Sequence, residues 1–346
     1  MINISERINL LDRHQVEKVK EFLGQFNLSY ENDIDYTLVI REEGEIIATC
    51  SKAKNIFKAF AINENHRGEG ITGTLITNLI DRMFEEGIYH SFIFTKPENA
   101  HIFSSLNFKL LYETKEAVIM ENGIQDINSY IDKIIKRYHI DLDSERVALV
   151  MNCNPFTNGH LYLIEEAAKE GKEVIVFVVE EDKSDFPFNN RIDLVKRGTS
   201  HLDNVKVLPG GEYIISSATF PTYFLKKEDD KLNIYTKIDG GIFGKYFCSK
   251  MNIKSRYLGE EPYCNVTRMY NETLKEELKK FNINIKIIPR KVYDKEPISA
   301  SRVRKLIKEG NMEKVKEIVP YTTFEFLLSK EGREIGERLK EINSPN

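Results

Sequence analysis

Residues 146–160 read R-V-A-L-V-M-N-C-N-P-F-T-N-G-H and carry the strongest fold signal in the chain. Residues 146–151 form an apolar run of the kind found in buried parallel strands. A tight turn with Pro155 follows, and residues 161–170 then have the apolar spacing of a helix. Together they predict one strand–turn–helix unit of an open α/β sheet, in which ligands bind where the strands end.

The same pattern continues through the second half of the chain. Continuous apolar runs at residues 174–179 and 283–288 alternate with helical segments, of which residues 266–280 are the clearest. Alternating strands and helices are typical of a parallel sheet covered by helices. We therefore predict an α/β domain with a parallel sheet over residues 141–346, ending in a charged helical tail at residues 312–340.

The first half of the chain, residues 1–140, shows a different order of elements. The pattern predicts strands at 36–40, 45–50, 57–62, 89–94 and in a pair over 108–120, and helices at 71–86 and 98–106. Mixed strands and helices in this order indicate an α+β domain. Residues 127–138 have helical spacing and are predicted to connect it to the second domain. A chain of 346 residues fits two domains of about 150 residues each, and we place the boundary near residue 140.

Composition excludes several classes of protein. Apolar residues make up 41% and charged residues 30%, which is ordinary for a chain with sizeable buried cores. The net charge of −4 provides no overall basic field for nucleic acid or an anionic membrane. We find neither the apolar core of a signal peptide nor an apolar run of the roughly 20 residues that span a bilayer. Four scattered cysteines without a CxxC pair argue against disulfides and zinc, so we expect a cytoplasmic protein with no nucleic-acid or membrane partner.

The turn before residues 161–170 is a candidate phosphate site. Backbone N–H groups at a helix N-terminus point outward and favour an anion. His160 can add a donor to a phosphate oxygen, and Thr157 can offer its hydroxyl to the same group. The alternative is an ordinary turn in which Thr157 caps the helix and His160 is exposed.

A second candidate lies at residues 298–304, which read I-S-A-S-R-V-R and open a predicted helix over 303–309. Ser299 and Ser301 offer hydroxyls, and Arg304 can bind a phosphate through two parallel hydrogen bonds. Arginines at a helix N-terminus are electrostatically unfavourable unless an anion is present. A capped surface helix with basic residues is the alternative. Two such helix starts in one α/β domain suggest a nucleoside triphosphate.

Further residues of the second domain are candidates of lower rank, each with a plain structural alternative. Lys183 follows a predicted strand and is placed to reach an α-phosphate, or else to be a solvated lysine. Arg191 and Arg290 would balance phosphate charge or form surface pairs. Asp239 and Gly240 are predicted at the end of another strand, where the backbone would approach a ribose.

In the first domain, residues 67–72 read R-G-E-G-I-T and join a predicted strand to the long helix over 71–86. Arg67, Gly68 and Gly70 belong to a loop that would expose successive backbone N–H groups and cradle a pyrophosphate at the helix start. A plain turn is the alternative for so short a loop.

The two segments of the second domain, N-P-F-T-N-G-H and I-S-A-S-R-V-R, resemble the (H/T)xGH and ISSTxxR signatures of the nucleotidyltransferase superfamily. The resemblance implies a Rossmann-like fold and transfer of a nucleotidyl group from a triphosphate with release of pyrophosphate. It implies that Thr157 and His160 act on the triphosphate, with Asn154, Phe156 and Gly159 in the same binding loop. The serines and the last arginine of the second segment would hold the distal phosphates.

The order of elements in the first domain and its R-G-E-G loop are similar to the GNAT acetyltransferase fold, whose loop binds the pyrophosphate of coenzyme A. Residues 99–108 resemble the segment that follows in that family. Phe103 stands where the family often carries a tyrosine that acts as a general acid. Because phenylalanine has no proton for a leaving thiolate, we predict that the pocket binds a coenzyme-A-like arm without transferring an acetyl group from it.

A GNAT-like domain ahead of a TxGH nucleotidyltransferase domain resembles the [citrate (pro-3S)-lyase] ligase family, over roughly residues 35–320. The resemblance implies an ATP-dependent, AMP-forming ligase that works by way of acetyl-AMP. Its acceptor would be the thiol of the phosphoribosyl-dephospho-coenzyme A group on the citrate lyase acyl carrier subunit. Acetate, ATP and Mg²⁺ are the implied small molecules, with the Mg²⁺ held through the triphosphate and not by a dedicated set of protein ligands.

Two other functions stay open on the sequence. An adenylyltransferase would use a phosphate acceptor and make a dinucleotide or dephospho-coenzyme A, but it gives no reason for the fused first domain. An acetyl-coenzyme A-dependent N-acetyltransferase with a regulatory nucleotide domain is disfavoured by Phe103. The acceptor separates these classes, because only the ligase activates acetate.

Overall fold

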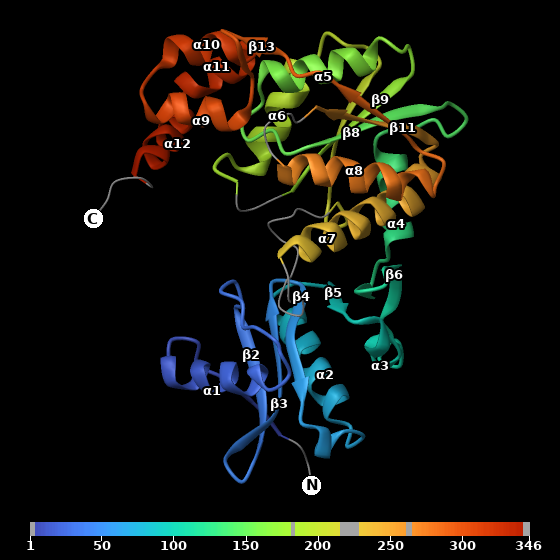
Figure 1. Cartoon of the computed structure of the whole chain (residues 1–346), viewed down its shortest axis with the longest axis vertical. Helices are drawn as coiled ribbons and strands as arrows, with labels where there is room; N and C mark the ends of the chain where they lie inside the picture. The colour runs from blue at the N-terminus through green and yellow to red at the C-terminus, as the bar shows by residue number, and fades with distance from the viewer. Residues whose placement is uncertain (1–3, 181–183, 215–227, 261–264, 342–346) are drawn as a thin grey trace. The chain divides into compact units, whose positions relative to one another are not determined.

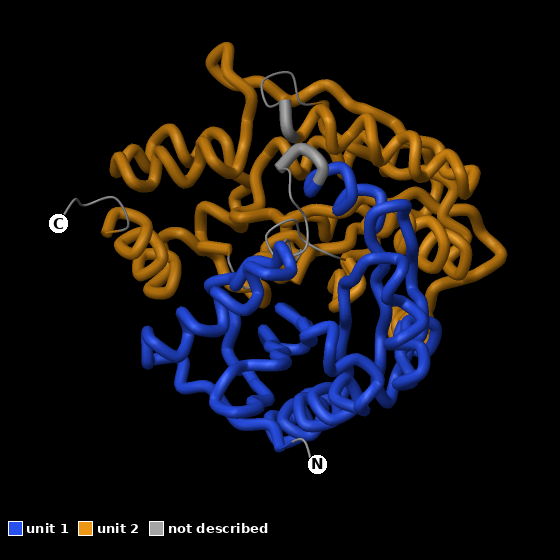
Figure 2. Tube along the Cα trace, turned by 60° about the horizontal axis from the view of Figure 1, so that its bottom comes forward, with its two compact units in different colours: residues 1–130, 221–238 blue, residues 131–220, 239–346 orange. Residues whose placement is uncertain are grey.

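A computed structural model describes residues 4–180, 184–214, 228–260 and 265–341 of the chain (Figure 1). The chain forms two compact units, Met1–Tyr130 with Pro221–Ile238 and Ile131–Phe220 with Asp239–Asn346 (Figure 2). The units part within helix α4 (Ile127–Arg137), whereas a domain boundary near residue 140 stays a prediction. Among the described residues, no helix is both long and apolar enough to cross a membrane.

The first unit is built on a seven-stranded sheet in the order β1-β2-β3-β4-β5-β7-β6. Its strands are β1 (Ser5–Arg7), β2 (Tyr36–Glu42), β3 (Glu45–Ala53), β4 (Ile56–Ile62), β5 (His90–Thr95), β6 (Lys109–Glu113) and β7 (Val118–Gly123). Only β4 and β5 pair parallel, at Ile56 with Phe92 and at Phe57 with Ile93. Their pairing stops there, although β4 continues to Ile62, and the short turn η1 (Glu64–His66) then leads to the predicted pyrophosphate loop.

Helices cover both faces of this sheet. Helix α2 (Ile71–Glu85) buries an apolar stripe at four-residue spacing against one face. Helix α1 (Arg13–Gly24) does the same against the other face. In β2, Leu38 belongs to the first core and Val39 to the second, because successive side chains of a strand point to opposite faces. The predicted α+β architecture is confirmed, and β1 and α1 are additional to the predicted elements.

The second unit is built on a five-stranded parallel sheet in the order β10-β9-β8-β11-β12. Its strands are β8 (Arg146–Met151), β9 (Glu173–Val178), β10 (Val205–Pro209), β11 (Ile253–Gly259) and β12 (Asn284–Ile288). The chain adds β9 and β10 on one side of β8 and then returns to add β11 and β12 on the other. The order therefore reverses between β8 and β11, and open α/β sheets bind ligands at such a reversal. The predicted parallel α/β sheet is confirmed.

Helices connect these strands and form the predicted helical tail. The connecting helices are α5 (Asn158–Ala168), α6 (Phe188–Gly198) and α8 (Asn265–Lys279). The C-terminal helices are α9 (Ala300–Lys308), α10 (Met312–Ile318), α11 (Tyr321–Leu328) and α12 (Lys330–Glu341). These last four lie together in Figure 1 and share an apolar core of their own.

The prediction of a strand ending at Asp239 and Gly240 is wrong, because both residues lie inside helix α7 (Glu228–Ile242). A side chain at Gly240 would approach Leu274 of α8 to 2.8 Å, so this glycine permits close packing of the two helices. The Asp239 carboxylate is buried and accepts a hydrogen bond from the Tyr270 hydroxyl (2.9 Å). Burial raises the pKa of Asp239. These positions therefore serve helix packing, and a ribose site at a strand end is not formed by them.

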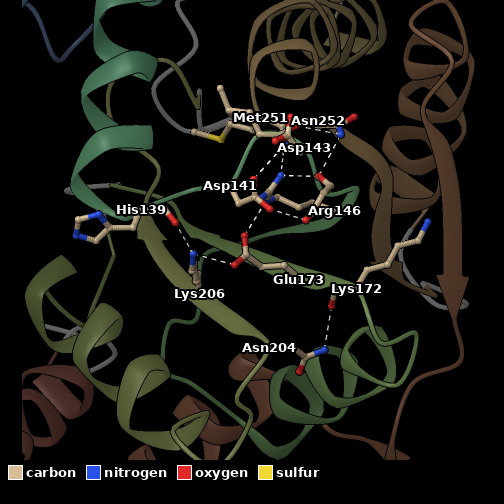
Figure 3. A network of polar contacts seen from close by, with 12 residues as sticks. His139, Asp141, Asp143, Arg146, Lys172, Glu173, Asn204, Lys206, Met251 and Asn252 are labelled. Carbon is tan, nitrogen blue, oxygen red and sulfur yellow. Dashed lines mark hydrogen bonds and ion pairs between the residues drawn. The ribbon is translucent and has the colours of Figure 1, made fainter.

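A polar network fixes the segment that enters β8 (Figure 3). Arg146 is fully buried, and it donates hydrogen bonds to the Glu173 carboxylate (2.6 Å) and to the carbonyl of Ser144 (2.6 Å). Lys206 lies 2.8 Å from the same carboxylate and donates to the carbonyl of His139 (2.8 Å). These bonds tie the connector after α4 to the strands of the second unit.

Replacing Arg146 with methionine should lower the free energy of unfolding by about 3 kcal/mol, because it removes a buried charged donor from the Glu173 carboxylate and from the carbonyls of Ser144 and Met251. Lys172→Met is the matched control, since Lys172 forms an exposed pair with Glu145 (2.8 Å) that is worth at most about 1 kcal/mol. Denaturant unfolding of the full chain, followed by circular dichroism, measures both losses. Equal losses in the two variants would contradict the role assigned to the buried network.

Candidate active site

A cavity of about 940 Å³ lies in the second unit, at the reversal of the strand order. Its walls come from the loop after β8 and the first turn of α5, the first turn of α8, and the segment from the end of β12 through the first two turns of α9. The lining residues are Asn152, Cys153, Asn154, His160, Thr267, Arg290, Lys295, Glu296, Pro297, Ser299, Ala300, Ser301, Arg302, Arg304 and Lys305. Two motifs that are far apart in the sequence therefore meet at one cavity.

His160 is held in the first turn of α5 by a reciprocal cap. The Thr157 hydroxyl accepts a hydrogen bond from the backbone N–H of His160 (3.3 Å), and His160 Nδ1 accepts one from the backbone N–H of Thr157 (3.1 Å). The Thr157 hydroxyl also lies 2.9 Å from Nδ1. Because Nδ1 accepts, the neutral ring carries its proton on Nε2, and this N–H is the donor that the ring can offer to a ligand.

The environment of His160 keeps its ring neutral. Burial, together with the positive charge of Arg290, lowers the pKa of His160 to about 4. Phe156 stacks on the imidazole with ring centroids 6.1 Å apart and planes within 11°. Phe156 and Thr157 are both buried and do not line the cavity. Both side chains therefore position His160, and a direct contact of either one with a ligand stays a prediction.

Gly159 lets the two motifs approach each other. A side chain at this position would lie 2.9 Å from the carbonyl oxygen of Ile298, closer than a Cβ atom can come. Because Ile298 directly precedes the start of α9, the missing side chain brings the N-termini of α5 and α9 to one cavity. Gly159 is outside the cavity lining, so it shapes the site without facing the ligand.

The first turn of α9 presents hydroxyl groups to the cavity. Ser299 caps the helix, its hydroxyl accepting from the backbone N–H of Arg302 (3.1 Å), and it lies 3.0 Å from the Ser301 hydroxyl. Across the cavity wall, Arg290 donates from Nε to the carbonyl of Glu260 (2.7 Å), which anchors this guanidinium near the end of β11. These groups supply hydrogen-bond donors of the kind that hold phosphate.

Arg304 links the two loops of the site. Its Nη1 donates to the carbonyl of Asn154, and its Nε lies 3.0 Å from the Asp185 carboxylate. The Asn154 amide also reaches Asp185 (3.4 Å). The sequence argument that arginines at this helix start need an external anion is therefore wrong in part. Asp185 pairs with Arg304, and Glu296 pairs with Arg302 (3.2 Å).

Arg191 stabilises this edge of the sheet and does not reach the cavity. It is fully buried and donates to the carbonyls of Asn152 (2.6 Å), Val179 (2.8 Å) and Phe186 (2.9 Å). These bonds tie the loop after β8 to the loop after β9. Backbone carbonyls hold the Arg191 guanidinium in the interior, so the alternative of a surface pair is wrong, and its balancing of phosphate charge stays a prediction.

The cavity gathers part of the residue set predicted from the sequence. The predicted residues that line it are Asn154, His160, Arg290, Ser299, Ser301 and Arg304. Lys183 lies outside the described residues. Arg302 is one of the two arginines expected at this helix start, whereas the sequence analysis misses Asp185 and Lys295. For Lys295, a charged residue shortly before the second motif was a usable signal.

The wall of the cavity is strongly basic. Its cations are Arg290, Lys295, Arg302, Arg304 and Lys305, and Glu296 is the acidic residue among the lining side chains. This excess of positive charge suits an anion that carries several phosphates. Among the described residues, no three His, Cys, Asp or Glu side chains are grouped to hold a metal ion.

The glycine loop of the first unit has the geometry of an anion site. Gly68 and Gly70 have φ angles of +89° and +76°, and Gly70 is the N-cap of α2. Within the part of the chain that the structure describes, no side chain caps this helix, and its first N–H groups have no acceptor within the helix. Arg67 is exposed beside them and pairs with Glu64 (3.1 Å). The loop therefore offers backbone donors and a positive helix end together.

Phe103 lies in α3 (Ala100–Ser104) and is buried in the core of the first unit. Its ring packs edge-on against Phe60 (5.6 Å between centroids) and Phe108 (6.1 Å). Phe103, where the sequence predicts that the general acid of the GNAT family is absent, therefore lies in an apolar environment. A phenylalanine has no transferable proton, and this packing gives the ring a place in the core.

Comparison with known proteins covers both units. A family model described as "Citrate lyase ligase C-terminal domain" matches residues 146–327, and one described as "Acetyltransferase (GNAT) family" matches residues 6–103. A [citrate [pro-3S]-lyase] ligase of Escherichia coli (strain K12) is 35% identical over 331 residues, which cover 94% of each chain. The chain belongs to the citrate lyase ligase family. The enzyme of the same name from Haemophilus influenzae is 36% identical over 330 residues, covering 93% of this chain and 97% of its own.

The family matches contain both candidate sites. The citrate lyase ligase match includes every lining residue of the cavity, and the GNAT match includes the glycine loop and Phe103. Among solved structures, the ribosomal-protein-S18-alanine N-acetyltransferase of Escherichia coli is 15% identical with a TM-score of 0.28. That comparison covers 36% of this chain and 96% of the other.

In this member of the citrate lyase ligase family, the imidazole of His160 should stay neutral far into the acid range. NMR titration should give a pKa of about 4 with the proton on Nε2, and Arg290→Gln should raise that pKa by removing a nearby positive charge. Because unfolding restores the ordinary value of 6.5, the stability associated with neutral His160 is present above pH 6.5 and is lost as the pH falls toward 4. A measured pKa of 6.5 in the folded chain would contradict the buried cap.

Proposed function

We propose that this chain is an ATP-dependent, AMP-forming acetate ligase that acetylates the thiol of the phosphoribosyl-dephospho-coenzyme A group on the citrate lyase acyl carrier subunit. The observation that carries the proposal is the meeting of His160 and the start of α9 in one basic cavity. Membership of the citrate lyase ligase family supports the choice of acceptor.

The basic cavity suits the triphosphate of ATP. Ser299 and Ser301 offer hydroxyls to the distal phosphates, next to the backbone N–H groups of the first turn of α9. Arg304 engages Nε and one N–H of Nη1 within the protein. A guanidinium has five N–H donors, so the others can bind a phosphate in the bidentate manner. Magnesium, when bound to the phosphates, would neutralise part of their charge.

The first step joins acetate to the nucleotide. A carboxylate oxygen of acetate attacks the α-phosphorus of ATP, the bond from the α-phosphorus to pyrophosphate breaks, and acetyl-AMP forms. The Nε2–H of His160 donates to an α-phosphate oxygen, while the serines and Arg304 hold the departing pyrophosphate. Positioning and fixed electrostatic donors supply most of the catalysis in such a displacement.

The second step transfers the acetyl group to the carrier. The thiol sulfur attacks the acetyl carbonyl, its proton goes to the medium, and AMP departs with the oxygen that linked it to the acetyl group. The glycine loop at Arg67, Gly68 and Gly70 would bind the pyrophosphate of the carrier arm through backbone donors. Phe103 is consistent with a first unit that binds the arm and does not transfer an acetyl group from acetyl-coenzyme A.

Pyrophosphate release from ATP tests the proposed function directly. The purified full chain is given ATP, Mg²⁺ and, in separate reactions, acetate, nicotinamide mononucleotide or phosphopantetheine. Release that depends on acetate and is increased by the acyl carrier subunit supports the ligase. Release with either phosphate acceptor and not with acetate would replace the proposal with an adenylyltransferase.

His160→Ala should lower kcat for acetate-dependent pyrophosphate release about 10²–10³-fold, because it removes one preorganised donor to developing charge. ATP binding should weaken much less, since the N–H groups of α5 remain. His201→Ala is the matched control, because His201 is an exposed histidine outside the cavity whose ring lies 3.6 Å from Glu165. Parental turnover in His160→Ala would remove this residue from the mechanism.

Gly70→Asp should leave acetate-dependent pyrophosphate release intact and reduce acetylation of the carrier about tenfold or more, because a carboxylate would repel the arm's pyrophosphate. Gly44→Asp is the control, since Gly44 also has a positive φ angle (+89°) and open space around it. Comparing the two variants separates backbone strain from loss of the anion site. Acetylated carrier is measured by mass spectrometry. Undiminished carrier acetylation in Gly70→Asp would defeat the assignment of the loop.

A further inference from the structure

A hairpin with a two-residue turn forms part of the lining of the basic cavity. Strands β13 (Val292–Tyr293) and β14 (Glu296–Pro297) pair antiparallel and leave Asp294 and Lys295 as the turn. Their φ angles are +53° and +62°, which is the left-handed pattern of a type I′ turn. Asn-Gly or Asp-Gly is the favoured sequence for this turn, because most side chains resist a positive φ. A lysine at the second turn position therefore costs conformational energy.

Arg302 fastens this hairpin to the start of α9. Its Nη1 donates to the carbonyls of Tyr293 (2.9 Å) and Glu296 (3.1 Å), on either side of the turn. Its Nε lies 3.2 Å from the Glu296 carboxylate. The backbone N–H of Ile298 also bonds to the carbonyl of Lys291 (2.9 Å), which closes the base of the hairpin. The turn is therefore held in place by the same helix start that presents Ser299.

Lys295 lines the cavity together with Ser299, Ser301 and Arg304. Its side chain is exposed, and its ammonium has no hydrogen-bond or ion-pair partner among the described residues. Glu296, the acidic residue of the same lining, is already paired with Arg302. Backbone strain at a residue that the surrounding structure holds firmly is often associated with a functional role. Lys295 meets that description, because its ammonium is unpaired among the described residues and its strained turn is held beside the start of α9.

We propose that Lys295 is a phosphate-binding residue of this cavity, held by the hairpin, and that Arg302 is its positioning residue. The inference rests on the proposed function for its choice of ligand. The anion is a phosphate group, and it comes either from the distal end of ATP or from the phosphates of the carrier arm. An ammonium on a lip of the cavity binds as a mobile point charge, unlike the fixed guanidinium of Arg304.

Tripolyphosphate is a suitable probe, because its binding can be measured by calorimetry without any turnover. Lys295→Gly is the main variant, since glycine accepts the positive φ and keeps the turn while removing the ammonium. Lys295→Arg keeps the positive charge. Lys291→Gln is the matched control, because Lys291 is a nearby exposed lysine outside the cavity lining. Each protein is the full chain, compared in the same buffer at low and high salt.

We expect Lys295→Gly to weaken tripolyphosphate binding about tenfold, equivalent to one charge-assisted contact. Lys295→Arg and Lys291→Gln should bind within about twofold of the parent. Arg302→Gln should weaken binding in the same direction, and the double variant Lys295→Gly/Arg302→Gln should lose less than the product of the two effects. If the turn were purely structural, Lys295→Gly would relieve its strain and the variant would bind tripolyphosphate as well as the parent.

Steady-state constants separate the two sources of the phosphate. A raised KM for ATP with weaker tripolyphosphate binding assigns Lys295 to the nucleotide. A raised KM for the carrier with unchanged tripolyphosphate binding assigns it to the arm. Unchanged tripolyphosphate affinity together with an unchanged KM for both substrates in Lys295→Gly overturns the proposal. If the parent binds tripolyphosphate through Lys295 yet shows no acetate-dependent pyrophosphate release, the proposed function fails and this binding role stands.

Discussion

The close approach of the backbone at Gly159 and Ile298 is the constraint on which the active-site cavity depends. A Cβ atom at Gly159 would lie 2.9 Å from the Ile298 carbonyl, so the contact exists only because this residue has no side chain. It brings the N-termini of α5 and α9 to the reversal of the strand order. Each helix start contributes partial positive charge and unpaired N–H groups. Placing two of them side by side is unfavourable until an anion joins them.

The protein offsets part of this positive charge with two arginine–carboxylate pairs that have the same arrangement. Arg304 and Arg302 each place Nε against a carboxylate, that of Asp185 or Glu296, and Nη1 against backbone carbonyls. Each guanidinium is thereby fixed and partly neutralised, and Arg304 keeps N–H donors that are available to a phosphate. The carboxylates come from two different loops, so the same pairs also hold the loops in register around the cavity.

The sequence predicts the parts of this site that are contiguous. The strand, the turn with His160 and the serines before α9 are local patterns, and the structure places them at one cavity. The helix cap at Thr157 was foreseen as the alternative for that residue. The roles of Phe156 and Arg191 were not readable, because burial and hydrogen bonding decide whether a side chain faces a ligand or supports one that does. Lys295 was missed since its place depends on a hairpin of only two residue pairs.

The misassigned segment at Asp239 shows how local propensity misleads. Residues 234–238 are rich in β-branched and aromatic side chains, which favour strands. The buried residues Ile234, Ile238 and Ile242 nevertheless recur at four-residue spacing, and that period selects a helix. The two glycines before Ile242 looked like the end of a strand, whereas Gly240 serves close helix packing. Periodicity over the longer window was the better guide.

The neutral state of His160 completes the electrostatic argument. A charged imidazole would add another cation to a wall that already carries Arg290 and Arg304, and the lowered pKa avoids that cost. The cap to Thr157 still fixes Nε2–H as a donor. A phosphate near Nε2 acts in the opposite sense to Arg290, because its negative charge favours the protonated ring. The hydrogen bond from Nε2–H to a phosphate oxygen therefore strengthens as negative charge develops on that oxygen. A donor of this kind stabilises a transition state more than the bound substrate, and that difference is what accelerates a reaction.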